Sequence, residues 1–151
     1  MKTNNETATA FVKGYESKSG NLCTNGETLT SYDTDIATHA NGVILMAKYY
    51  RCKNWDSWGY FLGQTKTTER HKSEVKTACY RQNVKYFEVA TIAIFGRKEH
   101  ERNYQLLKAE AVTLGERANR ARKEANRRFY TEQANRAEAT AQSYWNIFLA
   151  D

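Results

Sequence analysis

Positive side chains gather in one short stretch of the C-terminal third of the chain. Of the twelve residues from 117 to 128, six are Lys or Arg and only one, Glu124, is acidic. On a continuous helix, Arg120, Lys123 and Arg127 would share an outward face with asparagines beside them. Guanidinium and ammonium groups bind phosphate oxygens, and amides can hydrogen-bond phosphates or base edges. The sequence therefore indicates a nucleic-acid-binding surface made of Arg117, Asn119, Arg120, Lys123, Asn126, Arg127 and Arg128.

The same basic stretch has a simpler interpretation as the solvated face of a long helix. Arg and Lys are good helix formers, and charged residues commonly line the outer positions of a coiled coil. The formal net charge of +6 favours a polyanionic partner, but an excess of this size also serves solubility. Both interpretations stay open on the sequence alone.

Other residues that could do chemistry lack the partners that their chemistry needs. His71 would need a nucleophile or carboxylate in reach to act as a base, and Cys79 lies two helical turns away. Asp33 and Asp35 share one face of a strand, but no further metal ligands accompany them. The three cysteines have no C-x-x-C spacing and are expected to be free thiols. We therefore expect a structural His71, no catalytic residue, no metal, no cofactor and no enzyme.

A cluster of aromatic residues alternates with Lys and Arg just before the middle of the chain. Such a cluster could stack bases on the face of a sheet, but strands bury alternate residues, so core packing accounts for about half of it. Its members are Tyr49, Tyr50, Trp55, Trp58, Tyr60 and Phe61.

The basic stretch lies on a segment whose apolar residues follow a heptad rhythm. From Lys98 to Ala150 there is no Pro and a single Gly, so one helix could run for about 80 Å. A helix of that length must fold back on itself or pair with another chain. The 3-4 spacing predicts a narrow buried seam and hence a homo-oligomer interface at Tyr104, Leu107, Ala111, Leu114, Ala118, Ala121 and Ala125.

A second apolar stripe continues the segment in a different phase, about 120° further round the helix. It comprises Tyr130, Ala134, Ala137, Ala141, Tyr144 and Phe148. The shift in phase predicts a bend or a change of packing partner at Phe129–Tyr130.

Short β-strands separated by tight turns are predicted for the N-terminal half. Asn25-Gly26 and Asn41-Gly42 each separate apolar runs, which is typical of hairpins with type I′ turns. Strands are expected at residues 9–15, near 22, and at 27–32, 35–39, 43–51 and 58–64.

The pattern then changes to a helix from Thr67 to about Gln82, with Val75, Ala78 and Cys79 facing inward, followed by a buried strand over 84–95. The fold class is α+β, with a small and mostly antiparallel sheet, one short helix, and then a long C-terminal helix or helical hairpin. Residues 1–7 are expected to be flexible, 8–96 to form the α+β domain, and 97–151 to form the helical segment.

One pair of motifs resembles small bacteriophage-encoded domains. The stretch Leu29-Thr30-Ser31-Tyr32-Asp33-Thr34-Asp35-Ile36-Ala37 is similar to their L-x-S-Y-x-T-x-I-A strand, and Thr67-Thr68-Glu69-Arg70-His71 to their T-T-x-x-H helix start. The resemblance covers roughly residues 20–80. It implies a phage or prophage origin, and it carries over no catalytic residue because those domains have no assigned function.

These observations lead to one expected function and one alternative. We expect a non-enzymatic, phage-type accessory protein that binds a host or viral macromolecule, with inhibition of a host defence or transcription factor implied by the phage resemblance alone and nucleic acid as one candidate ligand. The alternative is an assembly protein whose C-terminal helix builds a multimer. The N-terminus lacks the apolar run of a signal peptide, and no run of apolar residues is long enough to span a bilayer, so we expect a cytoplasmic protein without membrane contact.

Overall fold

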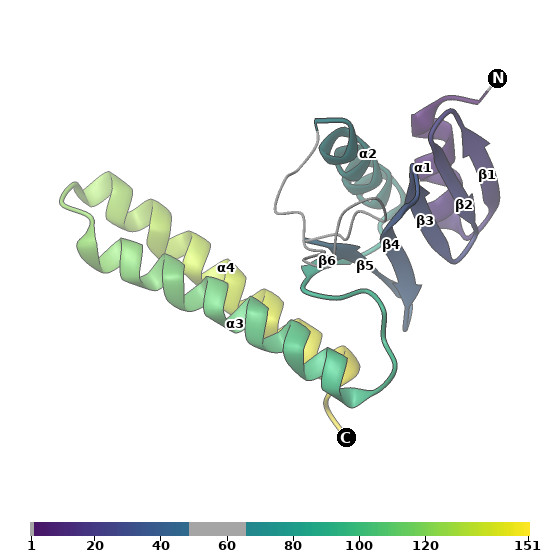
Figure 1. Cartoon of the computed structure of the whole chain (residues 1–151). Helices are drawn as coiled ribbons and strands as arrows, with labels where there is room; N and C mark the ends of the chain where they lie inside the picture. Colours follow the sequence, from purple (N-terminus) through teal and green to yellow (C-terminus); the bar gives the residue numbers. More distant parts are fainter. Residues whose placement is uncertain (1, 49–65) are drawn as a thin grey trace, which may run out of the picture. The chain divides into compact units, whose positions relative to one another are not determined.

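The computed structural model describes residues 2–48 and 66–151. The chain divides into two units, Met1–Glu88 and Val89–Asp151. The first holds helices packed on an antiparallel sheet and the second holds a helical hairpin (Figure 1). The predicted α+β class is confirmed. The unit boundary falls earlier than the expected division at 96/97, because the loop before the hairpin belongs to the second unit.

The chain begins with a helix, so the strand predicted at 9–15 is wrong. Helix α1 spans Asn4–Lys13 and therefore takes in part of the segment expected to be flexible. Its start is fixed by a capping box in which Thr3 accepts a hydrogen bond from the Glu6 N–H and the Glu6 carboxylate accepts one from the Thr3 N–H. Gly14 ends the helix in a left-handed conformation, at φ 85°.

Within residues 2–48 and 66–151 the sheet contains six strands in chain order, and the first five pair antiparallel with one another as neighbours. At the turn before β5, Asn41 and Gly42 both have positive φ, of 48° and 78°, as the type I′ prediction requires. At the other Asn-Gly pair only Gly26 has positive φ, and the Asn25 side chain instead accepts hydrogen bonds from two following N–H groups. The strands are β1 Glu16–Ser19, β2 Leu22–Asn25, β3 Thr28–Ser31, β4 Thr34–Ala40, β5 Val43–Ala47 and β6 Tyr86–Val89.

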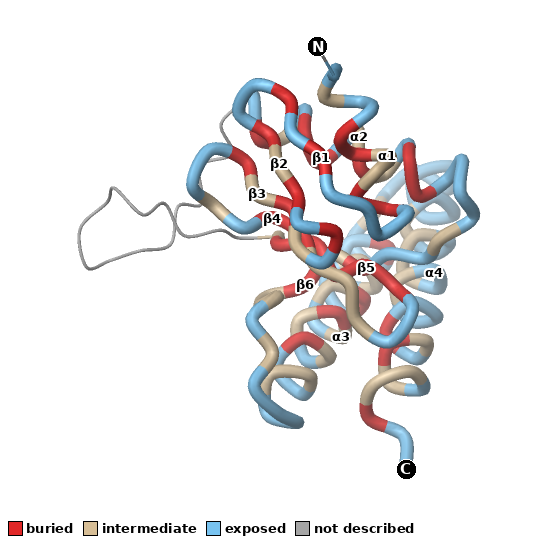
Figure 2. Tube along the Cα trace, turned by 90° about the vertical axis from the view of Figure 1, so that its right-hand side faces the viewer, coloured by how far each residue is buried: buried red, intermediate tan, exposed pale blue. Residues whose placement is uncertain are grey.

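Helices α1 and α2 pack against each other and bury one apolar core with the sheet. Helix α2 spans Lys66–Gln82, and Val75, Ala78 and Cys79 are buried as predicted. Burial alternates along β1, β2 and β3, with the two-residue period expected of a half-buried sheet, whereas every residue of β5 is buried (Figure 2). The core is made of Ala8, Phe11, Val12, Leu22, Leu29, Ile36, Ala37, Ile44, Met46, Val75, Ala78 and Cys79.

The strand predicted over 84–95 is shorter than expected. Only Tyr86–Val89 pairs in the sheet as β6, and residues 90–96 form an irregular connection. The strand predicted at 58–64 lies outside the described residues, as do Cys52 and the aromatic cluster at 49–61.

The C-terminal segment is a hairpin of two antiparallel helices. Helix α3 spans Arg97–Arg120 and α4 spans Glu124–Phe148, so the chain reverses at residues 121–123 (Figure 1). The bend or change of partner predicted at Phe129–Tyr130 is therefore misplaced, because α4 continues through both residues. The two apolar stripes are out of phase because they lie on two helices that face each other.

The hairpin buries within one chain three of the seven residues of the seam that predicted an oligomer, and it half-buries Tyr104 and Leu114. Leu107, Ala111 and Ala118 are no more than 6 % exposed, and the Tyr104 ring contacts Trp145 of α4 at 5.1 Å between centroids. The length of the segment therefore does not require a second chain, and self-association stays a prediction. At the far end of the seam, Ala121 lies in the turn and Ala125 is exposed.

Gly115 gives a direct test of helix α3. A Cβ atom at this position would meet no atom within 4 Å, and the residue lies inside the helix. Because alanine loses less backbone entropy than glycine on folding, Gly115→Ala should raise the free energy of unfolding of the hairpin by about 0.5–1 kcal/mol. Urea unfolding of the two proteins, followed by circular dichroism, measures the difference. A destabilised variant would contradict the helix at this position.

The described helices were also compared with the length and hydropathy of membrane spans. None of those in residues 2–48 and 66–151 is long and apolar enough to cross a bilayer.

Candidate functional site

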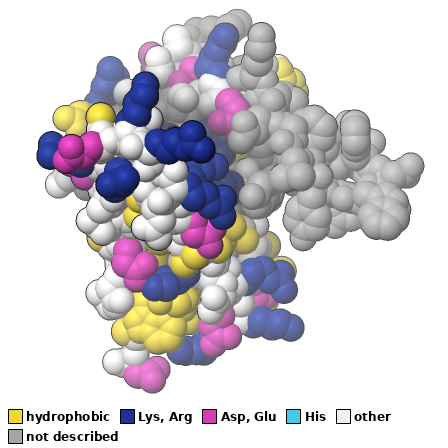
Figure 3. Space-filling view, turned by 90° about the vertical axis from the view of Figure 1, so that its left-hand side faces the viewer, with side chains coloured by type: hydrophobic (Ala, Val, Ile, Leu, Met, Phe, Trp, Pro, Cys, Tyr) yellow, Lys and Arg dark blue, Asp and Glu magenta, His cyan; other side chains and the backbone are white. Residues whose placement is uncertain are grey.

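The basic residues predicted from the sequence come together at the turn of the hairpin. Two of them end α3 and two begin α4, each pair with one asparagine beside it, and Arg122 and Lys123 lie in or next to the turn itself. We call the exposed group Arg117, Asn119, Arg120, Arg122, Lys123, Asn126, Arg127 and Arg128 the basic tip. All eight side chains are exposed, and Arg120 and Arg128 are 81 % and 78 % exposed. Figure 3 looks along the hairpin from this end and shows Lys and Arg side chains gathered on it.

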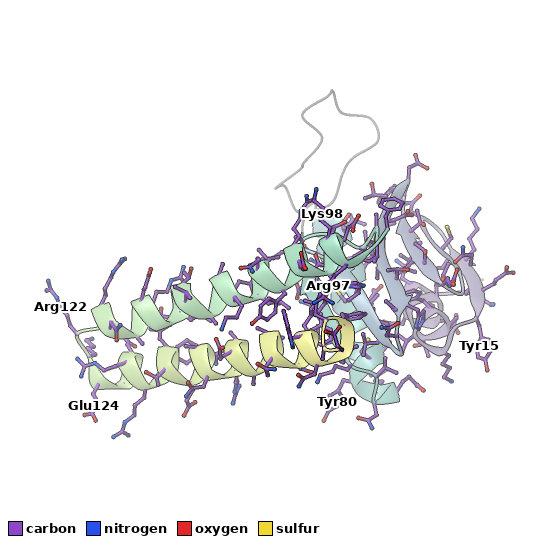
Figure 4. The ribbon with its side chains drawn as sticks, turned by 90° about the horizontal axis from the view of Figure 1, so that it is seen from below. Tyr15, Tyr80, Arg97, Lys98, Arg122 and Glu124 are labelled. Atoms are coloured by element: carbon purple, nitrogen blue, oxygen red, sulfur yellow. The ribbon has the colours of Figure 1, made fainter. Side chains whose placement is uncertain are left out.

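The fold-back changes the geometry that the sequence predicted. A continuous helix would have carried Arg120, Lys123 and Arg127 as one straight stripe, but the helix is interrupted at residues 121–123. The cations instead surround the turn that joins the two helices, with Arg122 and Glu124 labelled there in Figure 4.

Two acidic residues lie at the basic tip, and each is engaged by an arginine of its own helix. Glu116 lies 4.0 Å from Arg120 and Glu124 lies 3.0 Å from Arg128, both at i,i+4 spacing. Within the described part of the chain, four cations of the basic tip form no ion pair: Arg117, Arg122, Lys123 and Arg127. The basic tip therefore carries a net positive charge that is not neutralised locally.

The ends of the two helices contribute opposite partial charges at the turn: the N-terminus of α4 is positive and the C-terminus of α3 is negative. The N-terminus of α4 has no side-chain cap, so its first N–H groups lie at the turn with the positive end of the helix dipole. The C-terminus of α3 exposes carbonyl groups there, and Arg127 donates a hydrogen bond to the Ala121 carbonyl at 3.2 Å. Arginine thus compensates the negative end of α3 while the positive end of α4 stays open.

His71 is buried at 2 % exposure within a polar chain of the first unit. Ser19 donates a hydrogen bond to Asn4 Oδ1 at 2.8 Å, which directs Asn4 Nδ2 at His71 Nε2, 3.3 Å away. Because an amide nitrogen only donates, Nε2 accepts, and the proton of neutral His71 is on Nδ1. Nδ1 then donates to Ser31 Oγ at 2.7 Å. In this tautomer His71 cannot act as a base toward the Ser31 hydroxyl. The contact orients the two side chains, which is a structural role.

Burial and a nearby cation act on His71 in the same direction. Burial lowers the pKa of its imidazole below the ordinary range, and the charge of Arg70 lowers that pKa further. The neutral form is therefore the one that the fold stabilises.

A buried lysine next to His71 was not predicted. The Lys72 side chain is 2 % exposed, and its Nζ lies 3.5 Å from carboxylate oxygens of both Glu69 and Glu88. Burial would raise the pKa of Glu88, but its hydrogen bond with Lys76 and the charges of Lys72 and Lys76 outweigh that effect and lower it. The cluster compensates a buried charge, which is a structural role.

The open end of the hairpin holds a second polar network that the sequence analysis missed. Asn103 is fully buried, donates to the Thr91 carbonyl and the Tyr144 hydroxyl at 2.8 and 2.9 Å, and accepts from the Thr91 N–H at 2.8 Å. His100 Nδ1 lies 2.8 Å from the same hydroxyl. Burial raises the pKa of Tyr144 to about 12, against the opposing effect of Asn103. The sequence did contain a signal for this network: Asn103 lies four residues before Leu107, on the apolar face of the helix, where a polar side chain needs a buried hydrogen-bond partner.

The remaining candidates of the sequence do not assemble into a reactive site. Burial raises the pKa of the Cys79 thiol to about 11, so it stays protonated and unreactive near neutral pH. The Asp35 carboxylate accepts a hydrogen bond from Thr30, and Cys23 is a free thiol. In the described ranges, no three His, Cys, Asp or Glu residues lie together as a metal site.

The chain was compared with profiles of known protein families, with curated protein sequences and with solved structures, and nothing matches.

Proposed function

We propose that this protein binds nucleic acid without chemical turnover, and that the basic tip of the helical hairpin is the contact surface. The observation that supports the proposal is the presence of four exposed cations at the turn of the hairpin with no acidic partner in the described chain. Such a surface attracts a polyanion, and binding is favoured because the counterions condensed on the phosphates of the nucleic acid are released.

The composition of the basic tip favours contacts to the phosphate backbone over readout of base sequence. Cations predominate, and only Asn119 and Asn126 offer the paired donor and acceptor of an amide for base edges. We therefore expect binding that is strongly dependent on salt and weakly dependent on sequence. In keeping with the resemblance to phage-encoded domains, we propose that the protein acts in the host cytoplasm as an accessory factor.

The assembly alternative has less support than nucleic-acid binding. It depended on an apolar seam that needed a partner, and three residues of that seam, Leu107, Ala111 and Ala118, are buried within the same chain. The multimer is therefore not carried forward as a second function.

The proposal predicts that removing two charges from the basic tip weakens nucleic-acid binding, whereas removing two from the other end of the hairpin does not. Arg122→Gln with Lys123→Gln should lower the affinity for a DNA duplex by about 10- to 100-fold at about 50 mM salt, because each lost contact reduces counterion release. Lys98→Gln with Arg102→Gln is the matched control, since both residues are exposed at the start of α3 and the change in net charge is the same. Filter binding with labelled DNA and RNA measures the affinities.

Two results would contradict the proposal. If the unmutated protein retains neither DNA nor RNA at low salt, the basic tip does not bind nucleic acid. Equal loss of affinity in both double variants would mean that overall charge is responsible and the basic tip is not.

A further inference from the structure

A large apolar side chain is exposed next to the basic tip. Phe129 is 55 % exposed and lies five residues into α4, which is about 7.5 Å along the helix axis from its first residue. Its ring meets that of Tyr130 edge to face, with centroids 5.3 Å apart and an angle of 72° between the ring planes. The Phe129 ring therefore packs against Tyr130 on one side and is exposed to solvent elsewhere.

Packing of the hairpin does not account for Phe129. The stripe of α4 that faces α3 begins at Tyr130 and continues through Ala141 and Tyr144, which are buried. Phe129 precedes that stripe by one residue, so it is rotated by about 100° away from it. Asn126 lies one turn before Phe129 on the same side of the helix and is also exposed. An aromatic ring, an amide and unpaired cations therefore lie close together.

We propose that the ligand of the basic tip is single-stranded nucleic acid, with an unpaired base stacked on Phe129 and the neighbouring phosphates bound by the cations of the turn. This inference rests on the proposed function. Unpaired bases offer their faces to aromatic side chains, whereas the bases of a duplex are stacked on one another and offer none. A ring combined with cations is the arrangement used by proteins that bind single strands without sequence preference.

The test compares a single strand with a duplex of equal length. Phe129→Leu keeps an apolar side chain but removes the aromatic face, and it should weaken binding of labelled oligothymidylate and oligouridylate by roughly 5- to 100-fold. Its affinity for the DNA duplex should stay unchanged, and Phe129→Trp should retain the affinity for single strands. Phe95→Leu is the matched control, because Phe95 is 90 % exposed and precedes the start of α3, away from the turn. Fluorescence anisotropy at one salt concentration measures all the affinities.

The outcomes separate this inference from the function on which it rests. If Arg122→Gln with Lys123→Gln weakens binding but Phe129→Leu changes the affinity for neither the single strand nor the duplex, the phosphate-binding function stands and the stacking inference is wrong. If the unmutated protein binds neither probe, both are wrong. If Phe129→Leu only dissociates a dimer seen by sedimentation, Phe129 is a contact between copies of the chain and the inference is overturned.

Discussion

Replacing Asn103 by Leu should lower the free energy of unfolding of the hairpin unit by about 2–4 kcal/mol, although the two side chains are similar in size. The variant loses three hydrogen bonds and leaves the Thr91 N–H, the Thr91 carbonyl and the Tyr144 hydroxyl without their Asn103 partner. The Tyr144 hydroxyl keeps its contact with His100 Nδ1, but burying the Thr91 N–H and carbonyl without the Asn103 side chain costs more than the added apolar contact returns. Urea unfolding followed by the fluorescence of Trp145 and the other tryptophans measures the loss.

Asn135→Leu supplies the control for this prediction. Asn135 is exposed on α4, so the same chemical change there should alter the unfolding free energy by no more than about 0.5 kcal/mol. A similar small change for both variants would mean that the Asn103 network does not hold the open end of the hairpin.

His71→Ala should destabilise the first unit by about 2–4 kcal/mol at neutral pH. The substitution opens a cavity and removes the acceptor of Asn4 and the donor of Ser31 in a region closed to solvent. The unmutated unit should also lose stability as the pH falls. The folded-state pKa of His71 is lowered, so its contribution is complete above the unfolded value of about 6.5 and declines below it, where the unfolded chain binds the proton more readily.

The tautomer proposed for His71 gives this prediction an independent readout. Asn4→Ala removes the amide that donates to Nε2 and opens that nitrogen to protonation. The pKa of His71, followed by its ring proton resonances in NMR, should therefore move upward in the variant. No change would show that Asn4 does not fix the tautomer.

Sequence patterns predicted those elements in which local preference and packing agree. Helix α2 combines a hydroxyl-rich start with an apolar face, and the Asn41-Gly42 turn needs two residues with positive φ, so both are confirmed. Helix α1 was mistaken for a strand because its apolar residues are few. The capping box from Thr3 to Glu6, followed by apolar residues spaced i, i+3 and i+4 from Ala8, was the signal for a helix.

The turn of the hairpin could not be located from local sequence. Residues 118–128 contain neither Gly nor Pro and consist largely of good helix formers, so propensity alone favours a continuous helix. The chain reverses at Ala121 because the two apolar stripes are of similar length. In a hairpin they bury each other, whereas on a continuous helix both would be exposed to water. Composition was therefore enough to select the basic residues, but their arrangement around one end depends on the tertiary fold.

The partners of buried polar residues could not be predicted from the sequence either. Asn103, His71 and Lys72 occupy positions in the apolar register of their helices, and a polar residue there predicts a buried partner without identifying it. The partners, such as Thr91 and Asn4, come from other segments whose approach depends on packing.

The dependence of affinity on salt tests the phosphate contacts of the basic tip most directly. Arg117, Arg122 and Lys123 form no ion pair within the described chain, and together they should contact about three phosphates. Replacing all three by Gln should therefore make the slope of log affinity against log salt on a DNA duplex less negative by about 2.7. The control is the triple variant Lys98→Gln, Arg102→Gln and Arg136→Gln, which removes the same charge from exposed positions away from the turn and should leave the slope unchanged. A slope that stays the same in the basic-tip variant, or changes equally in both, would contradict the account.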